Sequence, residues 1–285
     1  MSRRKSPFRI IAAIIVTAWL AVVIFYYQQP AVRYQQVIVL DVGQGDSILL
    51  TSPQGRTVLI DGGPDRGILQ AISPYLPWWD KHLDLMVLTH PHADHLNGLN
   101  YILDNYQVDK VLATGVNHTA DNYSLWLQKI KVQNIELEIM DSPRGLAWDG
   151  CQLNFLYPTG SFLKHSVDNL NNTSIVSRLE CGQVSFLLTG DLENEGEAAL
   201  LQSGADLSTT VLKVGHHGSN TATGVAWLSA VKPQLAVISS GKDNIYSHPH
   251  QETLKHLQAA GAQILRTDQL GDIRLLTDGQ TVWRD

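Results

Sequence analysis

The stretch LTHPHADH, from Leu88 to His95, constrains this chain more strongly than any other part of its sequence. It ends the nearly all-apolar run LDLMVLTH, which predicts a strand buried on both faces. Four side chains that can bind a metal ion fall within six residues: His90, His92, Asp94 and His95. Imidazole and carboxylate are the ligands that divalent ions such as zinc select. The stretch therefore predicts a metal site at a strand end, the alternative being a solvated His-rich loop.

The spacing of these ligands suggests two ions rather than one. In an extended stretch His90 and His92 point the same way, because side chains alternate with period two, so both can hold one ion. Asp94 and His95 lie where the chain turns into the next helix, so they can be directed at a second ion.

Strands and helices alternate along the rest of the chain. Short apolar strands (QVIVLDV, DSILLTSP, RTVLIDGG) separated by Gly- and Pro-bearing turns occupy the chain up to about residue 63. Helices are predicted at 97–106 and 124–131, and the second half alternates helix and strand. This order indicates an α/β fold with two packed sheets and helices outside. No linker divides residues 31–285, which we expect to form one domain.

The N-terminus carries an uncharged stretch, IIAAIIVTAWLAVVIFYY, over residues 10–27. It is just long enough to span a bilayer, and the preceding RRKSPFR favours a cytoplasmic start. We therefore expect residues 1–30 to form a cytoplasmic start and a single transmembrane helix, with the remaining domain outside the cytoplasm. A cleaved signal peptide and a buried helix are the alternatives, but the run is long for a signal peptide and no A-x-A site follows.

Charge is unevenly distributed. The net charge of the chain is −6, and the first thirty residues hold four basic residues and no acid, which leaves −10 on the remainder. A domain this acidic is not an obvious nonspecific binder of polyanions, because such binding rests on many Lys and Arg contacts to phosphate.

The two cysteines, Cys151 and Cys181, both lie on predicted strands. If those strands pair antiparallel, the two residues face each other, and an oxidising compartment permits a disulfide. The alternative is two buried free thiols, and from the sequence we favour this interpretation. Neither cysteine has the C-x-x-C spacing of a metal or redox site.

Three residues further along the chain can complete the metal site. Asp191 follows the strand QVSFLLTG, where taken alone it would be a helix N-cap. His216 and His217 lie in VGHHGS, where taken alone they would be surface residues of a glycine turn. Because LTHPHADH needs further ligands, strand-end aspartate and histidine residues are the natural ones.

In order along the chain, VLIDGG, the H-x-H-x-D-H pattern, FLLTGD and VGHHGS resemble the metallo-β-lactamase fold superfamily. The resemblance implies a four-layer αββα sandwich with two divalent metal ions, Zn²⁺ or Mn²⁺. It also implies that Asp61 supports the metal-binding loop and that Asp191 bridges the two ions. Between the paired histidines, we favour His217 as the ligand and His216 as a contact to substrate phosphate.

One departure from the superfamily weakens the first metal site. Many members have a histidine where this chain reads DNLNNTSIVSRLE. The first ion then has His90, His92 and Asp191, joined by an oxygen of Asn171 or by water. Such a site should bind more weakly and prefer a harder ion such as manganese.

The motifs DVGQGDS, VLIDGG, LTHPHADH, an N-x-x-S turn, LTGD and KVGHHGS together resemble the metallo-hydrolase domain of ComEC-type competence proteins. That family implies DNA uptake, degradation of the strand that is not transported, and a DNA-uptake channel as partner. The glycines of DVGQGDS do not form a dinucleotide loop, because the third glycine would fall at Ile48 and a strand follows. The resemblance puts Asp46 beside the metal cleft, either behind the ligands or facing substrate. A plain hairpin turn is the alternative.

We therefore predict a membrane-anchored, metal-dependent phosphodiester hydrolase acting on DNA. Asp94 orients the nucleophile or shuttles its proton, and His216 or His248, the latter in YSHPH, neutralises charge on phosphoryl oxygens. Substrate contacts are expected from motif residues, namely Asp46, Asn171, Ser174 and Ser219. The alternatives are hydrolysis of a cell-surface phosphodiester of phosphocholine or teichoic type, and a non-catalytic tethered binding module.

Overall fold

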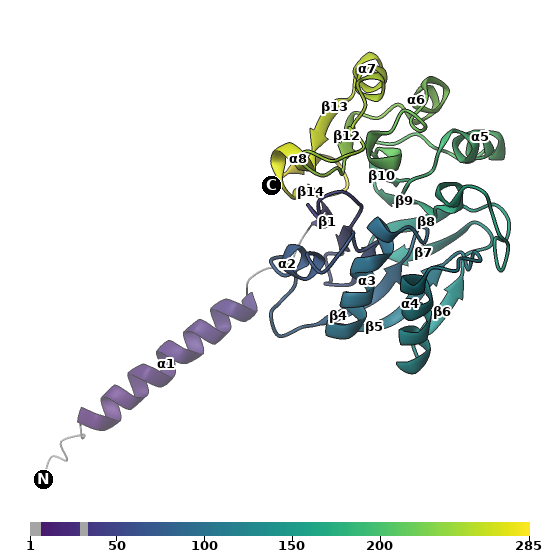
Figure 1. The fold of residues 1–285 in the computed structure, drawn as a ribbon. Helices are drawn as coiled ribbons and strands as arrows, with labels where there is room; N and C mark the ends of the chain where they lie inside the picture. Colours follow the sequence, from purple (N-terminus) through teal and green to yellow (C-terminus); the bar gives the residue numbers. More distant parts are fainter. Residues whose placement is uncertain (1–6, 29–33) are drawn as a thin grey trace, which may run out of the picture. The chain divides into compact units, whose positions relative to one another are not determined.

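Two mixed β-sheets pack face to face in the computed structural model, which describes residues 7–28 and 34–285 (Figure 1). The chain divides into two units, residues 1–33 and 34–285. The described part of the first unit is helix α1 (Pro7–Gln28), which contains the uncharged stretch at 10–27. Across the described residues, no helix combines the length and apolar character needed to cross a bilayer.

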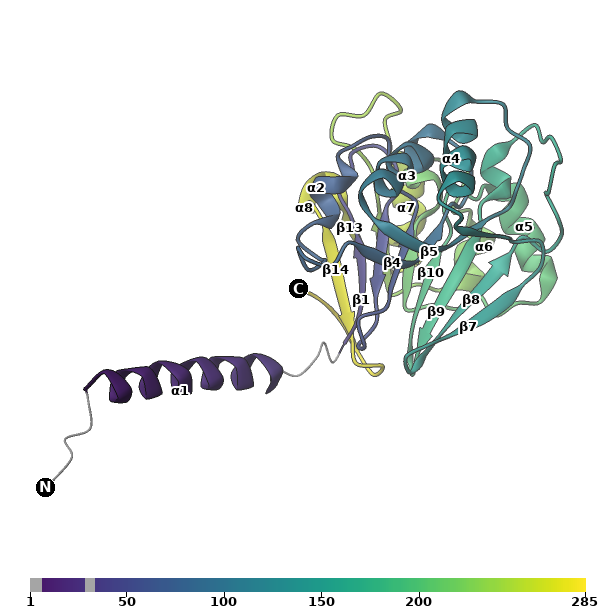
Figure 2. The ribbon, with the colours of Figure 1, turned by 90° about the horizontal axis from the view of Figure 1, so that it is seen from below.

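The first sheet has eight strands in the order β15-β14-β1-β2-β3-β4-β5-β6. Neighbours from β15 to β3 are antiparallel, whereas β3, β4, β5 and β6 run parallel. Figure 2 shows β14 beside β1, so the two ends of this unit meet in one sheet. Its strands are β1 (Gln35–Val39), β2 (Ile48–Thr51), β3 (Thr57–Ile60), β4 (His82–Val87), β5 (Gln107–Ala113), β6 (Glu136–Ile139), β14 (Ile273–Thr277) and β15 (Val282–Arg284).

The second sheet has seven strands in the order β13-β12-β11-β10-β9-β8-β7. Neighbours from β7 to β10 are antiparallel, and β10 to β13 run parallel. Its strands are β7 (Arg144–Trp148), β8 (Cys151–Tyr157), β9 (Val176–Cys181), β10 (Val184–Leu188), β11 (Val211–Lys213), β12 (Leu235–Ile238) and β13 (Gln263–Arg266). The predicted α/β fold with two packed sheets is confirmed.

Helices cover the outer face of each sheet (Figure 1). The first sheet carries α2 (Ile68–Ile72), α3 (Ala93–Asn105) and α4 (Asp121–Val132), and the second carries α5 (Asn194–Ser203), α6 (Val225–Val231) and α7 (Gln251–Ala259). Shorter segments are α8 (Thr267–Leu270) and the 3₁₀ turns η1 (Leu170–Thr173) and η2 (Gly215–Gly218). The helix predicted at 97–106 begins four residues earlier, so Asp94 and His95 already belong to α3.

Three hydrophobic cores hold these layers together. Strand β1 illustrates the pattern: Val37 and Val39 face the core between the sheets, whereas Ile38 faces the helices. This alternation follows from the period-two geometry of a strand, and it makes the central strands apolar on both faces. Trp126 of α4 fills one outer core and Trp227 of α6 fills the other. The strands are thereby fixed, and their carboxyl ends form a rigid rim.

The two cysteines form a disulfide bond, so the free-thiol interpretation was wrong. Strands β8 and β9 pair antiparallel with Gln152 opposite Glu180, which brings Cys151 opposite Cys181. Their Cα atoms are 4.4 Å apart, the spacing of directly opposed residues in an antiparallel pair. Sequence could not decide the pairing because the register of the two strands was unknown.

Candidate metal centre

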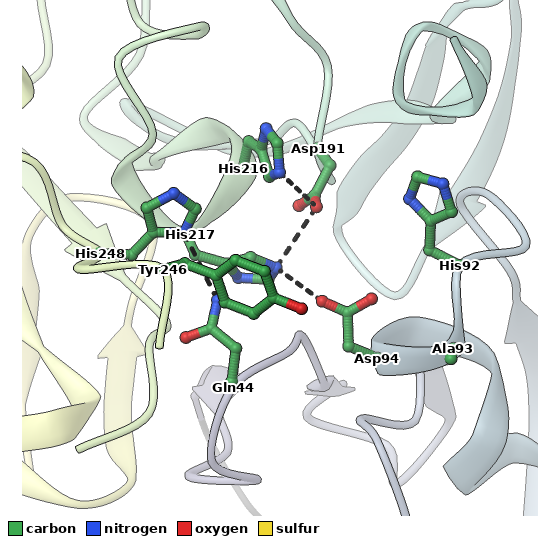
Figure 3. Close-up of a pocket in the computed structure, with 9 residues that line it drawn as sticks. All are labelled: Gln44, His92, Ala93, Asp94, Asp191, His216, His217, Tyr246 and His248. Carbon is green, nitrogen blue, oxygen red and sulfur yellow. Dashed lines mark hydrogen bonds and ion pairs between the residues drawn. The ribbon is translucent and has the colours of Figure 1, made fainter. Parts of the chain in front are cut away.

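Four imidazole rings converge on one carboxylate oxygen at the rim formed by the strand ends. The Nε2 atoms of His95 and His217 lie 3.2 and 3.3 Å from Oδ2 of Asp191. Those of His216 and His90 lie 3.9 and 4.0 Å from the same oxygen. Figure 3 shows Asp191 between His216 and His217, with Asp94 on the side of the cavity that carries His92.

Parallel strands explain why residues so distant in sequence meet here. Asp61 and His90 follow β3 and β4, which are parallel neighbours in the first sheet. Asp191 and the paired histidines follow β10 and β11, which are parallel neighbours in the second. Within η2, His216 and His217 have φ angles of 46° and 54°. This left-handed backbone is uncommon for residues other than glycine and is held by the surrounding structure.

The Nδ1 atoms of two rings are fixed by buried acceptors. His95 Nδ1 lies 2.8 Å from Oδ2 of Asp61, and His217 Nδ1 lies 3.0 Å from the carbonyl oxygen of Ser239. A proton held on Nδ1 leaves the Nε2 lone pair free to bind a metal. Both Nε2 atoms point towards Asp191 and could bind a metal ion there once they lose their protons.

Asp61 also orients His90, through the hydroxyl group of Thr89. Thr89 donates its Oγ1 hydrogen to Asp61 at 2.7 Å, so its oxygen can accept from Nδ1 of His90, 3.0 Å away. Asp61 additionally accepts the Thr89 backbone N–H at 2.8 Å. One buried carboxylate thus braces the two ends of the metal-binding loop, in the way that ligand-supporting carboxylates do.

Three atoms that face this centre make no hydrogen bond to the described residues, although two of them lie within ion-pair distance of Asp191 Oδ2. His95 Nε2, His217 Nε2 and Asp191 Oδ1 are buried without a hydrogen bond from any described residue. Asp94, His95, Asp191 and His217 each offer a ligand atom, and these atoms all lie within 4.8 Å of one another. Buried polar groups normally find a partner, so this donor set fits a divalent cation.

His90 and His92 form the other side of the centre. Nε2 of His90 lies 3.0 Å from Nδ1 of His92, so the two nitrogens can bind one ion. Nearby, Asn171 donates from Nδ2 to Glu193 at 3.1 Å, while its Oδ1 is buried and accepts no hydrogen bond from the described residues. That orphan oxygen fits the predicted ligand role of Asn171.

Residues 40–242 match the metallo-beta-lactamase superfamily. The chain belongs to this superfamily. It is 33% identical over 261 residues to ComE operon protein 3 of Bacillus subtilis, covering 84% of this chain and 32% of that protein. It is also 33% identical over 245 residues to Competence protein ComA of Neisseria gonorrhoeae, and the match covers 84% of this chain and 32% of that protein. The resemblance to ComEC-type competence proteins is therefore confirmed, and the chain spans about a third of the length of these relatives.

A solved structure supports the fold independently. Zn²⁺-bound PqqB from Methylobacterium extorquens superposes with a TM-score of 0.51 at 11% identity, covering 81% of this chain and 97% of that one. At this identity the likeness concerns the fold alone. The buried His/Asp cluster of the present chain is consistent with the divalent metal binding typical of the superfamily.

The protonation of the cluster reflects its charge pattern. Burial would raise the pKa of Asp191, but His217 and His95 outweigh it and hold that pKa well below its usual range. Burial would lower the pKa of His95, but Asp191 and Asp61 raise it well above its usual range. Without an ion, protons on the imidazoles therefore neutralise the carboxylates. A bound cation takes over that role and displaces them.

Asp46, in the GQGD turn between β1 and β2, lies behind the ligands. It is 1% exposed, and its Oδ1 lies 3.3 Å from Nδ1 of His217 while its Oδ2 lies 2.6 Å from Nζ of Lys213. Of the two predicted positions, the structure places Asp46 behind His217 and away from the cavity. Gly45 is required here, because a Cβ on it would meet the carbonyl oxygen of Asp94 at 2.2 Å.

The two predicted substrate-binding serines are both buried. Ser174 Oγ lies 3.3 Å from Nδ1 of His90 and accepts the backbone N–H of Asp191 at 3.1 Å. Ser219 Oγ lies 2.9 Å from Thr221 Oγ1. Neither lines the cavity described below, so both brace the site, and their contact with substrate stays a prediction.

Two functional candidates were not identified in the sequence. Glu193 accepts hydrogen bonds from Asn171 Nδ2 and Thr221 Oγ1 at 3.1 and 2.9 Å, and its Oε1 lies 2.9 Å from Nδ1 of His216. An acid two residues after Asp191 was a usable signal for it. Lys213 is the second of these candidates. A lysine at the end of an otherwise apolar strand was the feature of the sequence that could have indicated it.

A cavity of about 340 Å³ opens over the centre. Among the described residues that line it, none is lysine or arginine. They are Gln44, His92, Ala93, Asp94, Asp191, His216, His217, Tyr246 and His248 (Figure 3). Burial, reinforced by His217 and His216, lowers the pKa of His248 to about 4, so this ring is neutral near pH 7.

Proposed function

We propose that this chain is a metal-dependent phosphodiester hydrolase that cleaves DNA. The observation that carries the proposal is the convergence of four Nε2 atoms, 3.2 to 4.0 Å from one oxygen of Asp191, beneath an open cavity. A carboxylate shared by two groups of imidazoles suits a site for two cations. The residues on one side are His90 and His92, and those on the other are Asp94, His95 and His217.

Divalent cations in such a site lower the pKa of water towards neutrality and stabilise negative charge on phosphoryl oxygens. The chain's own contribution begins with Asp94, whose Oδ2 lies 3.3 Å from Nε2 of His217. Burial raises the pKa of Asp94, but His95 and His217 lower it further, so the group is ionised. As a carboxylate at the cavity wall, Asp94 can accept the proton of an attacking water.

His248 supplies a donor on the opposite wall. The amide nitrogen of Gln44 lies 3.5 Å from Nδ1 of His248 and can donate to it, which leaves the proton of the neutral ring on Nε2. An Nε2–H group can donate to a phosphoryl oxygen without a full charge. His216, held by Glu193 with Nε2 towards Asp191, is the second candidate for this task.

DNA is the substrate that the relatives favour. One of them is named Competence protein ComA and another ComE operon protein 3, and the resemblance to ComEC-type competence proteins implies DNA uptake. We propose a DNA-uptake channel as its partner, because the chain is homologous to ComEC-type competence proteins.

We also propose that the hydrolase domain lies outside the cytoplasm. The Cys151–Cys181 disulfide supports an oxidising compartment, where such bonds persist. The uncharged residues 10–27, preceded by basic residues, support a single-pass anchor in the cell membrane. A reporter fused to the C-terminus and active only in the cytoplasm tests this orientation; reporter activity would contradict it.

The activity is tested with purified full-length protein loaded with Mn²⁺ or Zn²⁺. Single-stranded DNA, double-stranded DNA, a generic phosphodiester and a polyglycerol phosphate are incubated in parallel, beside a known nuclease. DNA cleavage that EDTA abolishes supports the proposal. Cleavage of the glycerol polymer alone indicates a cell-surface substrate. Absence of any cleavage, with less than one metal per chain by elemental analysis, indicates a binding module.

A further inference from the structure

A half-exposed aromatic side chain stands at the mouth of the cavity. Tyr246 lies on the loop between β12 and α7, lines the cavity, and is 56% exposed. Its neighbour Ile245 is 89% exposed. Figure 3 shows the Tyr246 ring beside His248 and above Gln44, facing the side that carries Asp94. Two neighbouring large side chains exposed at the mouth of a cavity form a candidate ligand-binding surface.

The loop that carries Tyr246 is held in place by its own hydrogen bonds. Asn244 donates from Nδ2 to the carbonyl oxygens of Gly241 and His248 at 2.9 and 2.6 Å, and its Oδ1 accepts the His248 N–H at 3.0 Å. Gly241 N–H donates to Gln44 Oε1 at 3.1 Å, which ties the loop to the GQGD turn. The Tyr246 ring stacks on His248 with centroids 5.7 Å apart and planes 26° apart. The aromatic face is therefore presented in one orientation.

Because the domain is acidic, its affinity for nucleic acid must come from something other than contacts of basic side chains to phosphate, and the Tyr246 ring can supply it. Residues 31–285 carry a net charge of −10, and the described residues that line the cavity include no lysine or arginine. Contacts of basic side chains to phosphate, the usual source of affinity for nucleic acid, are therefore scarce around the site. Stacking on an aromatic ring is the other general source, and it accepts any base because every base has a π-face.

We propose that Tyr246 is a stacking platform for a nucleobase of a single-stranded nucleic acid whose phosphate lies over Asp191. This inference rests on the proposed function and sharpens its substrate class. In a duplex the bases are stacked on one another, so a single strand offers a free base at lower cost. Phosphodiester polymers without bases gain nothing from Tyr246.

The test compares two oligonucleotides that differ only in their bases. Oligodeoxythymidylate and an abasic oligonucleotide of the same length carry the same 5′ fluorescein. Binding to the full-length protein is measured by anisotropy in EDTA, which prevents turnover, and cleavage is measured separately with Mn²⁺. We expect the wild type to bind the thymidylate strand roughly 5- to 150-fold more tightly than the abasic strand, the range of one base–aromatic stack.

Substitutions assign that preference to the ring. Tyr246→Ala should bring the ratio of the two affinities towards one, and Tyr246→Phe should keep it, because stacking does not use the hydroxyl. Tyr101→Ala, which removes a 39%-exposed tyrosine from α3 outside the cavity, should leave the ratio as in the wild type. Equal binding of both strands by the wild type, or an unchanged ratio in Tyr246→Ala, would overturn the inference. Absence of cleavage with a normal binding ratio would instead refute the hydrolase proposal alone.

Discussion

Nζ of Lys213 lies 2.6 Å from Oδ2 of Asp46, and both side chains are almost completely buried. Lys213 is the last residue of β11 and precedes the paired histidines closely in the sequence. Asp46 belongs to the GQGD turn between β1 and β2. The second oxygen of Asp46 reaches Nδ1 of His217 at 3.3 Å. This ion pair therefore joins the two sheets directly behind a candidate metal ligand.

Removing one member of that pair should be more damaging than removing both. Lys213→Met leaves a buried, uncompensated carboxylate and is expected to lower the free energy of unfolding by about 3–5 kcal/mol. Lys213→Met combined with Asp46→Asn leaves no unpaired charge, so the double variant should lower the free energy of unfolding by less than the single one. Urea denaturation of both variants measures the difference, with Lys255→Met, an exposed site on α7, as the control. A double variant no more stable than the single one would contradict this account of the pair.

Asp191→Ala should remove both metal binding and turnover. The substitution deletes the oxygen that faces His95 and His217. Loss of a group that only orients a ligand costs 10- to 100-fold, so loss of Asp191 should lower turnover at least roughly 100-fold. Elemental analysis should find less metal per chain than in the wild type. Glu252→Ala, an exposed acid on α7, is the matched control, and equal metal content in the two variants would remove Asp191 from the site.

Glu197 should make stability depend on pH. Its carboxylate accepts the N–H groups of Thr223 and Gly224 at 2.5 and 3.2 Å, yet burial raises its pKa to about 7. The folded state therefore holds this proton more tightly than the unfolded state, and its contribution to stability falls as pH rises from about 4.5 to 7. Glu197→Gln cannot titrate. Relative to wild type, the variant should gain on the order of 1–3 kcal/mol between pH 5 and pH 8 in urea denaturation, and a constant difference between the two proteins would contradict this.

The disulfide should contribute measurably to stability. Cys151 and Cys181 are 30 residues apart in the sequence, so the bond constrains the unfolded chain. Reduction, or substitution of both cysteines by alanine, should lower the free energy of unfolding by about 2–4 kcal/mol. The alanine variant should not respond to a reducing agent, which separates the bond from other effects of reduction. Equal unfolding midpoints for oxidised and reduced wild type would show that the bond is dispensable.

Several parts of the site were accessible from local sequence. His90, His92, Asp94 and His95 lie within six residues, so their ligand chemistry is visible without knowing the fold. Asp191 could be proposed because a carboxylate at the end of an apolar strand stands at the rim of a parallel sheet. The two-sheet architecture followed for the same reason, since alternating apolar patterns specify strands and helices locally.

Other features depend on which distant segments become neighbours. The Cys151–Cys181 bond requires the register of β8 against β9, and the Lys213–Asp46 pair requires contact across two sheets. Tyr246 begins the YSHPH stretch, but its place at the cavity exists only because the β12–α7 loop folds back to the GQGD turn. Sequence by itself determined the ligand types and the order of the elements, because both are local properties. The tertiary structure decided which side chains support those ligands and what meets the substrate, because those relations arise from packing between segments far apart in the chain.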